Sequence, residues 1–138
     1  MPKESYQKKG MSKKEIYSKA VEAVEKGDFY RAGELAEKIG NKKLADEIYG
    51  KAALKLVEKG WFRNAEEFDY VRKLVEKISD KKLADEMYGK AALKLVEKGF
   101  FDYARKSAEK IKDKKLADDI RRRLERGAEG KGKAKGKR

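Results

Sequence analysis

The chain contains no cysteine, no histidine and no threonine, and it has a single proline. Without cysteine it forms no disulfide. Without cysteine and histidine it lacks a thiolate nucleophile, an imidazole base and the usual nitrogen and sulfur ligands of zinc. It also has no glycine-rich loop of the Walker or dinucleotide-binding type. We therefore predict a protein that is not an enzyme and that uses no cofactor, no metal and no small-molecule substrate.

Long apolar runs are also missing. No stretch of 18 apolar residues exists, and no hydrophobic signal region follows the first methionine, so we expect no membrane span and a soluble, cytoplasmic protein. Asn, Gln and Met are scarce, whereas 46% of the residues are charged. This composition is typical of hyperthermophile proteins, and we expect a hyperthermophilic archaeal source. A strongly charged helical protein from a mesophile is the alternative.

The dominant positive feature is a duplication. Residues 42–60 (KKLADEIYGKAALKLVEKG) return at 81–99 with one difference, Met87 in place of Ile48. Gly27, Gly60 and Gly99 each follow Glu-Lys and open the pattern G-x-F-x-x-A, at spacings of 33 and 39 residues. Self-similarity at such a period indicates stacked repeats of a helix, a tight glycine turn and a second helix.

Capping residues support this interpretation. Ser12 and Glu15 have the spacing of a capping box, and Asn41, Asp80 and Asp113 each precede a Lys-Lys-Leu-Ala-Asp stretch as candidate N-caps. Short links of two or three residues make neighbouring helices antiparallel. The predicted helices are 13–26, 29–39, 42–59, 62–78, 81–98, 101–111 and 114–126.

In the helix 42–59, apolar residues at i, i+3/4 and i+7/8 form one face, with Leu54 and Val57 lying off it. The residues predicted on this face are Ile48, Tyr49, Ala52, Ala53 and Leu56. The second unit is six residues longer, and the extra residues precede Phe68. We interpret Trp61, the only tryptophan, as a filler of the wider gap between helices.

The turn pattern resembles the tetratricopeptide repeat, whose turn commonly reads G-D-[FY]-x-x-A, and Gly27-Asp28-Phe29 with Ala32 is the closest match. The family's small residue falls on Ala20, Ala53 and Ala92. The resemblance covers residues 13–126 and implies an all-α fold, a short right-handed α-solenoid of three hairpins and a capping helix. Residues 1–12 are then a basic flexible N-terminus and 127–138 a disordered Gly/Lys-rich tail.

The same resemblance implies a binding groove formed by the first helix of each hairpin. The positions that line the concave surface in tetratricopeptide domains are Gly50, Leu54, Val57, Gly89, Leu93 and Val96. An apolar groove floor suits a partner helix, an extended peptide or a second copy in a homodimer. Tight packing of Leu54 and Leu93 within the array is the alternative. Because Leu54 and Leu93 stand where chaperone adaptors place asparagine, we do not expect a carboxylate clamp.

Charge is concentrated at the two ends. Residues 121–138 carry nine Lys or Arg against two Glu, and residues 1–14 carry five Lys against one Glu, so the rest holds only +2 of the total +13. Basic tails bind polyanions by releasing counterions, and we predict contact with RNA, the ribosome being the first choice. A solubilising tail is the alternative. The candidate residues are Arg121, Arg122, Arg123, Arg126, Lys131, Lys133, Lys135, Lys137, Arg138, Lys8 and Lys9.

Acidic pairs recur with the repeat, as Asp46 and Glu47, Asp85 and Glu86, and Asp118 and Asp119. Such pairs are able to hold a cation. Solvated or lysine-paired positions on a helix face are the interpretation that we favour.

Overall fold

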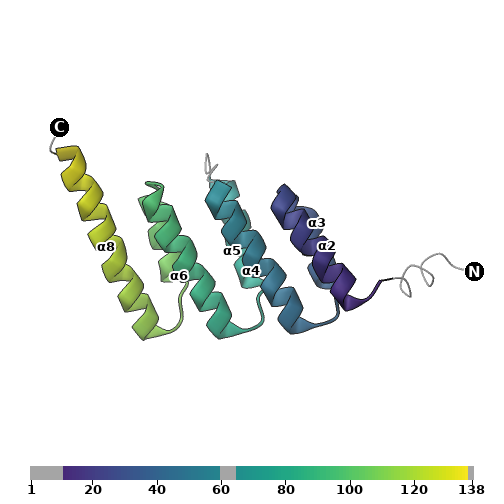
Figure 1. Cartoon of the computed structure of the whole chain (residues 1–138). Helices are drawn as coiled ribbons and strands as arrows, with labels where there is room; N and C mark the ends of the chain where they lie inside the picture. Colours follow the sequence, from purple (N-terminus) through teal and green to yellow (C-terminus); the bar gives the residue numbers. More distant parts are fainter. Residues whose placement is uncertain (1–10, 60–64, 137–138) are drawn as a thin grey trace, which may run out of the picture.

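The structure, a computed structural model, describes residues 11–59 and 65–136 (Figure 1). This part of the chain is helical and contains no strand, which confirms the predicted all-α class. Lys8, Lys9, Gly60, Trp61, Lys137 and Arg138 lie outside the described residues. The helices are α2 (Lys13–Lys26), α3 (Phe29–Lys38), α4 (Lys42–Lys59), α5 (Ala65–Glu76), α6 (Lys81–Glu97), α7 (Phe101–Glu109) and α8 (Lys114–Gly136).

The predicted caps are in place at the helix starts. Ser12 and Glu15 form a reciprocal capping box at α2. The Asn41 side chain accepts a hydrogen bond from the Leu44 amide before α4. Side chains of Asp80 and Asp113 accept from the first amides of α6 and α8. Each cap satisfies an orphan amide and contributes about 1 kcal/mol, which is why these boundaries could be read locally.

Glycine turns join α2 to α3 and α6 to α7. Gly27 and Gly99 have φ of 84° and 89°, in the left-handed region where a Cβ would be strained. The amide that follows each turn bonds back into the preceding helix, from Asp28 to the Ala23 carbonyl and from Phe100 to the Leu95 carbonyl. The predicted end of α2 at residue 26 is therefore confirmed, and α6 ends at Glu97, one residue before the predicted end.

The helices lie side by side in a row, with α2 and α3 at one end and α8 at the other (Figure 1). We call α2, α4, α6 and α8 the first helices, and α3, α5 and α7 the second helices. Each first helix contacts the next first helix in the row. Each second helix contacts the first helix before it and the first helix after it. The core therefore runs continuously along the row.

Small residues allow the close packing. Ala20, Ala53 and Ala92 are fully buried, one in each of three first helices. Val57 is fully buried, although the sequence predicts it off the apolar face, whereas Leu56, predicted on that face, is partly exposed. The reason is tertiary: α4 contacts α2, α3, α5 and α6, so its buried arc is wider than the stripe of a helix with one neighbour.

The last helix differs from the prediction in length. We expect it to end at residue 126, with a disordered tail after it, but α8 continues to Gly136 and has 23 residues. Extending an existing helix carries no nucleation cost, and the Ala, Glu and Lys residues favour the extension while each glycine opposes it by about 1 kcal/mol. Gly127 also has a packing role, since a Cβ there would lie 2.7 Å from Cγ1 of Val96.

Candidate functional site

Two glycines of the predicted groove are buried where first helices meet. A Cβ on Gly50 would lie 3.2 Å from Sδ of Met87, and one on Gly89 would lie 3.2 Å from Cδ1 of Ile120. Each glycine thus accepts an apolar side chain of the next first helix. We call these contacts the glycine joints. Their repetition shows that the duplicated segment encodes the attachment of one unit to the next.

The other groove residues divide into two classes. Val57 and Val96 are buried, whereas Leu54 and Leu93 are partly exposed. Gly50, Gly89 and Val57 therefore pack between helices instead of lining an open surface, whereas Val96 also borders a cleft among α6, α7 and α8. Leu54 does line a shallow hollow of about 210 Å³ between α2 and α4, together with Val21 and Val24.

The acidic pairs contain structural residues that the sequence pattern did not reveal. Asp46 is only 4% exposed and accepts hydrogen bonds from the Ser79 amide (2.8 Å), the Ser79 hydroxyl (2.9 Å) and the Asp80 amide (3.1 Å). These donors lie in the loop that precedes the next first helix. Three donors offset the cost of burying a carboxylate, and the favoured solvated interpretation is wrong for Asp46.

Asp85 repeats this arrangement one unit later. It is buried and accepts from the amides of Lys112 and Asp113, each at 3.0 Å. We call the two arrangements the aspartate latches. One signal points to them: Lys-Lys-Leu-Ala-Asp ends in Asp in all three copies, although in the third copy Asp118 pairs with Arg121 instead. Within residues 11–59 and 65–136, no group of three or more acidic side chains is placed to hold a metal ion.

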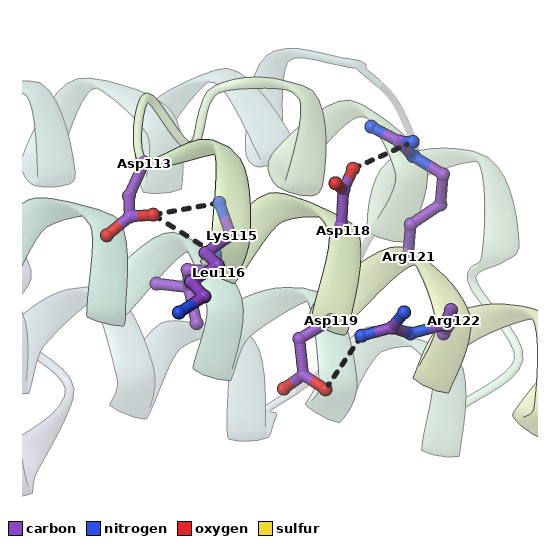
Figure 2. A network of polar contacts seen from close by, with 7 residues as sticks. All are labelled: Asp113, Lys115, Leu116, Asp118, Asp119, Arg121 and Arg122. Carbon is purple, nitrogen blue, oxygen red and sulfur yellow. Dashed lines mark hydrogen bonds and ion pairs between the residues drawn. The ribbon is translucent and has the colours of Figure 1, made fainter.

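The predicted arginines lie along α8 with exposed side chains. Arg121 pairs with Asp118 at 3.3 Å and Arg122 with Asp119 at 3.9 Å (Figure 2). Arg123 also reaches Asp119, at 3.4 Å. Ion pairs of this kind, three or four residues apart on a helix surface, contribute only about 0.3–0.5 kcal/mol, so a phosphate can replace the carboxylate at small cost.

The structure also brings most of the basic candidates onto one element. Arg126 is exposed on α8, and Lys131, Lys133 and Lys135 belong to the same continuous helix. Because α8 has 23 residues and α6 has 17, α8 extends about 9 Å further, and it rises past its neighbour in Figure 1. The basic C-terminal segment of α8, residues 126–136, is therefore an extension at the end of the row, and we call it the arm.

No protein-family model, no curated protein and no solved structure matches this chain. In the part of the chain that the structure describes, none of the helices has the length and apolar character needed to cross a membrane.

Proposed function

We propose that this protein is a non-enzymatic interaction protein that binds RNA through its basic ends, with the ribosome as its target. In this proposal the helices form a short right-handed solenoid of three tetratricopeptide-like hairpins, closed by α8. The ordered contacts between successive first helices support that arrangement. The observation that carries the function is the concentration of exposed basic residues on α8, against a body that is nearly neutral.

The physical basis is the exchange of weak ion pairs for phosphate contacts. Arg121, Arg122 and Arg123 are held by carboxylates three or four residues away. When an arginine side chain leaves its carboxylate for an RNA phosphate, its charge stays paired. The contact also releases counterions from the RNA, which is the main source of sequence-independent affinity. The remaining surface of the helical row is then available to contact a ribosomal protein.

The test uses two full-length variants with equal charge. One carries Arg126→Gln, Lys131→Gln, Lys133→Gln and Lys135→Gln on the arm. The control carries Lys42→Gln, Lys43→Gln, Lys81→Gln and Lys82→Gln at exposed helix starts. Affinity for a single-stranded RNA oligonucleotide is measured across a salt series, and co-sedimentation with ribosomal fractions is measured in parallel.

We expect the arm variant to bind RNA more weakly. The slope of log affinity against log salt concentration should become less steep by up to about 3, at about 0.7 per lost phosphate contact. The control should keep most of the slope of the unmodified protein. Equal slopes for the two variants would show that the arm has no special role in RNA binding and would overturn the proposal.

A second candidate function is a protein adaptor or a homodimer that uses the predicted groove. The hollow beside Leu54 favours it, and Leu93 has the equivalent place in α6. Leu54→Asp combined with Leu93→Asp should abolish association with a partner or with a second copy while circular dichroism shows unchanged helicity. Association that survives both substitutions would exclude this groove.

A further inference from the structure

A cleft of about 490 Å³ lies among α6, α7 and α8. Its apolar lining comprises Val96, Phe101, Ala108 and Leu124, and its rim carries both signs of charge, including Arg121 and Glu125. Val96 also belongs to the predicted groove and Arg121 to the predicted RNA-binding residues, but none of the lining residues belongs to the glycine joints. The cleft lies on the last hairpin and the last helix.

The repeat shows what covers the same surface one unit earlier. Phe68 stands at the position of Phe101 in the F-D-Y-x-R-K pattern, and Tyr88 and Ala91 stand at the positions of Arg121 and Leu124. Phe68, Tyr88 and Ala91 are 5%, 8% and 1% exposed. In that unit the equivalent of the cleft is therefore closed.

The element that closes it is α7. The Tyr103 ring stacks on Phe68 with centroids 4.8 Å apart, and the Ser107 hydroxyl donates to the Tyr88 carbonyl at 2.8 Å. A second helix that lies antiparallel to α6 thus fills the space between α5 and α6. Helix α8 runs past Gly132, which stands at the position of the Gly99 turn, so among the described residues no second helix turns back to fill the space between α7 and α8.

We infer that the α7–α8 cleft binds an amphipathic helix of a partner protein, in the place that α7 occupies one unit earlier. The bound helix lies antiparallel to α8 and sets an aromatic side chain against Phe101, as Tyr103 sets its ring against Phe68. Arg121 and Glu125 replace Tyr88 and Ala92, so the partner helix carries both acidic and basic residues on its flanks. An RNA strand does not fit, because the floor is apolar and Glu109 and Glu125 line the cleft.

The experiment uses the full chain and a defined probe. The probe is a synthetic peptide with the sequence of residues 100–113, held helical by a lactam between Asp102 and Lys106, which are exposed and four residues apart. A scrambled peptide with the same bridge is the control. Binding is followed by shifts of backbone amide resonances.

We expect saturable binding of one peptide per chain, with the largest shifts at residues 101–108 and 121–125. Phe101→Ala should weaken binding at least about tenfold, since an aromatic anchor carries much of such an interface. Tyr30→Ala is the matched control, because Tyr30 is 74% exposed and lies on α3 at the other end of the row. It should leave the affinity unchanged.

A separate variant protects against a folding artefact. Glu125→Lys alters only an exposed side chain. It should change the affinity for the original peptide in one direction, and the affinity for a peptide with Glu109 and Asp113 replaced by lysine and the bridge kept in the opposite direction. Absence of binding, or shifts outside the cleft, would overturn the inference. So would a dimer of the protein alone that Phe101→Ala dissociates, because the occupant would then be a second copy. Shifts of the same amides with RNA and none with the peptide would also overturn it.

Discussion

Helices α6 and α8 begin with the same five residues, Lys-Lys-Leu-Ala-Asp, and then diverge. Both pack in the same way on the preceding first helix: Met87 of α6 lies against Gly50 of α4, and Ile120 of α8 lies against Gly89 of α6. They differ on the face toward a following unit. In α6 this face holds Tyr88, Gly89 and Ala92, all buried, and α8 has Arg121, Arg122 and Glu125 at the same positions, all exposed.

The comparison teaches that the contacts of a first helix with the preceding and with the following first helix depend on separate residues. Residues that contact the preceding first helix, such as Ile120, are kept in α8. Residues that accept the next unit are replaced by charged side chains, and Arg122 leaves no glycine for an incoming apolar side chain. Asp118 has lost the role of Asp85 as well, because its side chain is 47% exposed and pairs with Arg121. Helix α8 therefore lacks the residues with which α6 accepts a following unit.

The glycine joint provides the strongest way to break the comparison. Gly89→Val places a branched side chain against Ile120, whose Cδ1 would already lie 3.2 Å from the new Cβ. We expect a loss of about 2–3 kcal/mol in the free energy of unfolding, since overpacking forces the helices apart. Urea denaturation monitored by circular dichroism measures it.

Arg122→Val is the control at the matched position of α8, where the side chain is 71% exposed. It should change the free energy of unfolding by less than about 0.5 kcal/mol. Similar losses for the two variants would contradict the conclusion that α8 lacks a glycine joint for a following unit.

The aspartate latch gives the next largest effect. Asp85→Ala leaves the amides of Lys112 and Asp113 without their carboxylate acceptor, and we expect a loss of about 1–3 kcal/mol in the free energy of unfolding. Asp118→Ala makes the same chemical change in α8 and removes only an exposed ion pair, so the expected loss is below about 0.5 kcal/mol. Equal losses in urea denaturation would mean that the latch adds nothing to stability.

The smallest effect concerns pH. Burial, helped by the carboxylates of Glu76 and Asp85, raises the pKa of Tyr88 to about 12, from a usual value of about 10. The folded state thus keeps its phenol proton at a pH where the unfolded state has lost it. The stabilisation is fully present below about pH 10 and is lost as the pH rises to about 12.

Tyr88→Phe should therefore flatten the fall in unfolding free energy between pH 10 and 12 relative to the unmodified protein. The offset between the two proteins at pH 7, where Tyr88 is neutral in both states, measures the packing change alone. Parallel stability curves across this range would show that Tyr88 does not titrate differently on folding.

Much of the fold was predictable because its determinants are local. Ser12, Asn41, Asp80 and Asp113 cap helices through bonds to amides two or three residues away, and the Gly27 turn depends on one backbone angle. These features need no knowledge of distant contacts. The helix starts and the all-α class follow from them.

The remaining features depend on residues that meet only after folding. Asp46 is buried by a loop 33 residues later in the chain, and Val57 is buried because α4 has neighbours on several sides. The family resemblance places Gly50 in a groove, because the sequence pattern does not reveal that Met87 fills the space above it. Sequence reasoning misses the cleft beside α8 for the same reason, because only the folded row shows that α7 fills the equivalent space one unit earlier.

The aspartate latch also has an evolutionary consequence. Residues 42–80 contain Asp46 together with the Ser79–Asp80 loop that it binds, Gly50 to accept a side chain of the next first helix, and Ile48 at the sequence position of Met87. An in-frame tandem copy of this stretch would insert into the row without any compensating mutation. The near identity of 42–60 and 81–99 is the trace that such an event leaves, and the length of this protein can change in whole units while both ends stay the same.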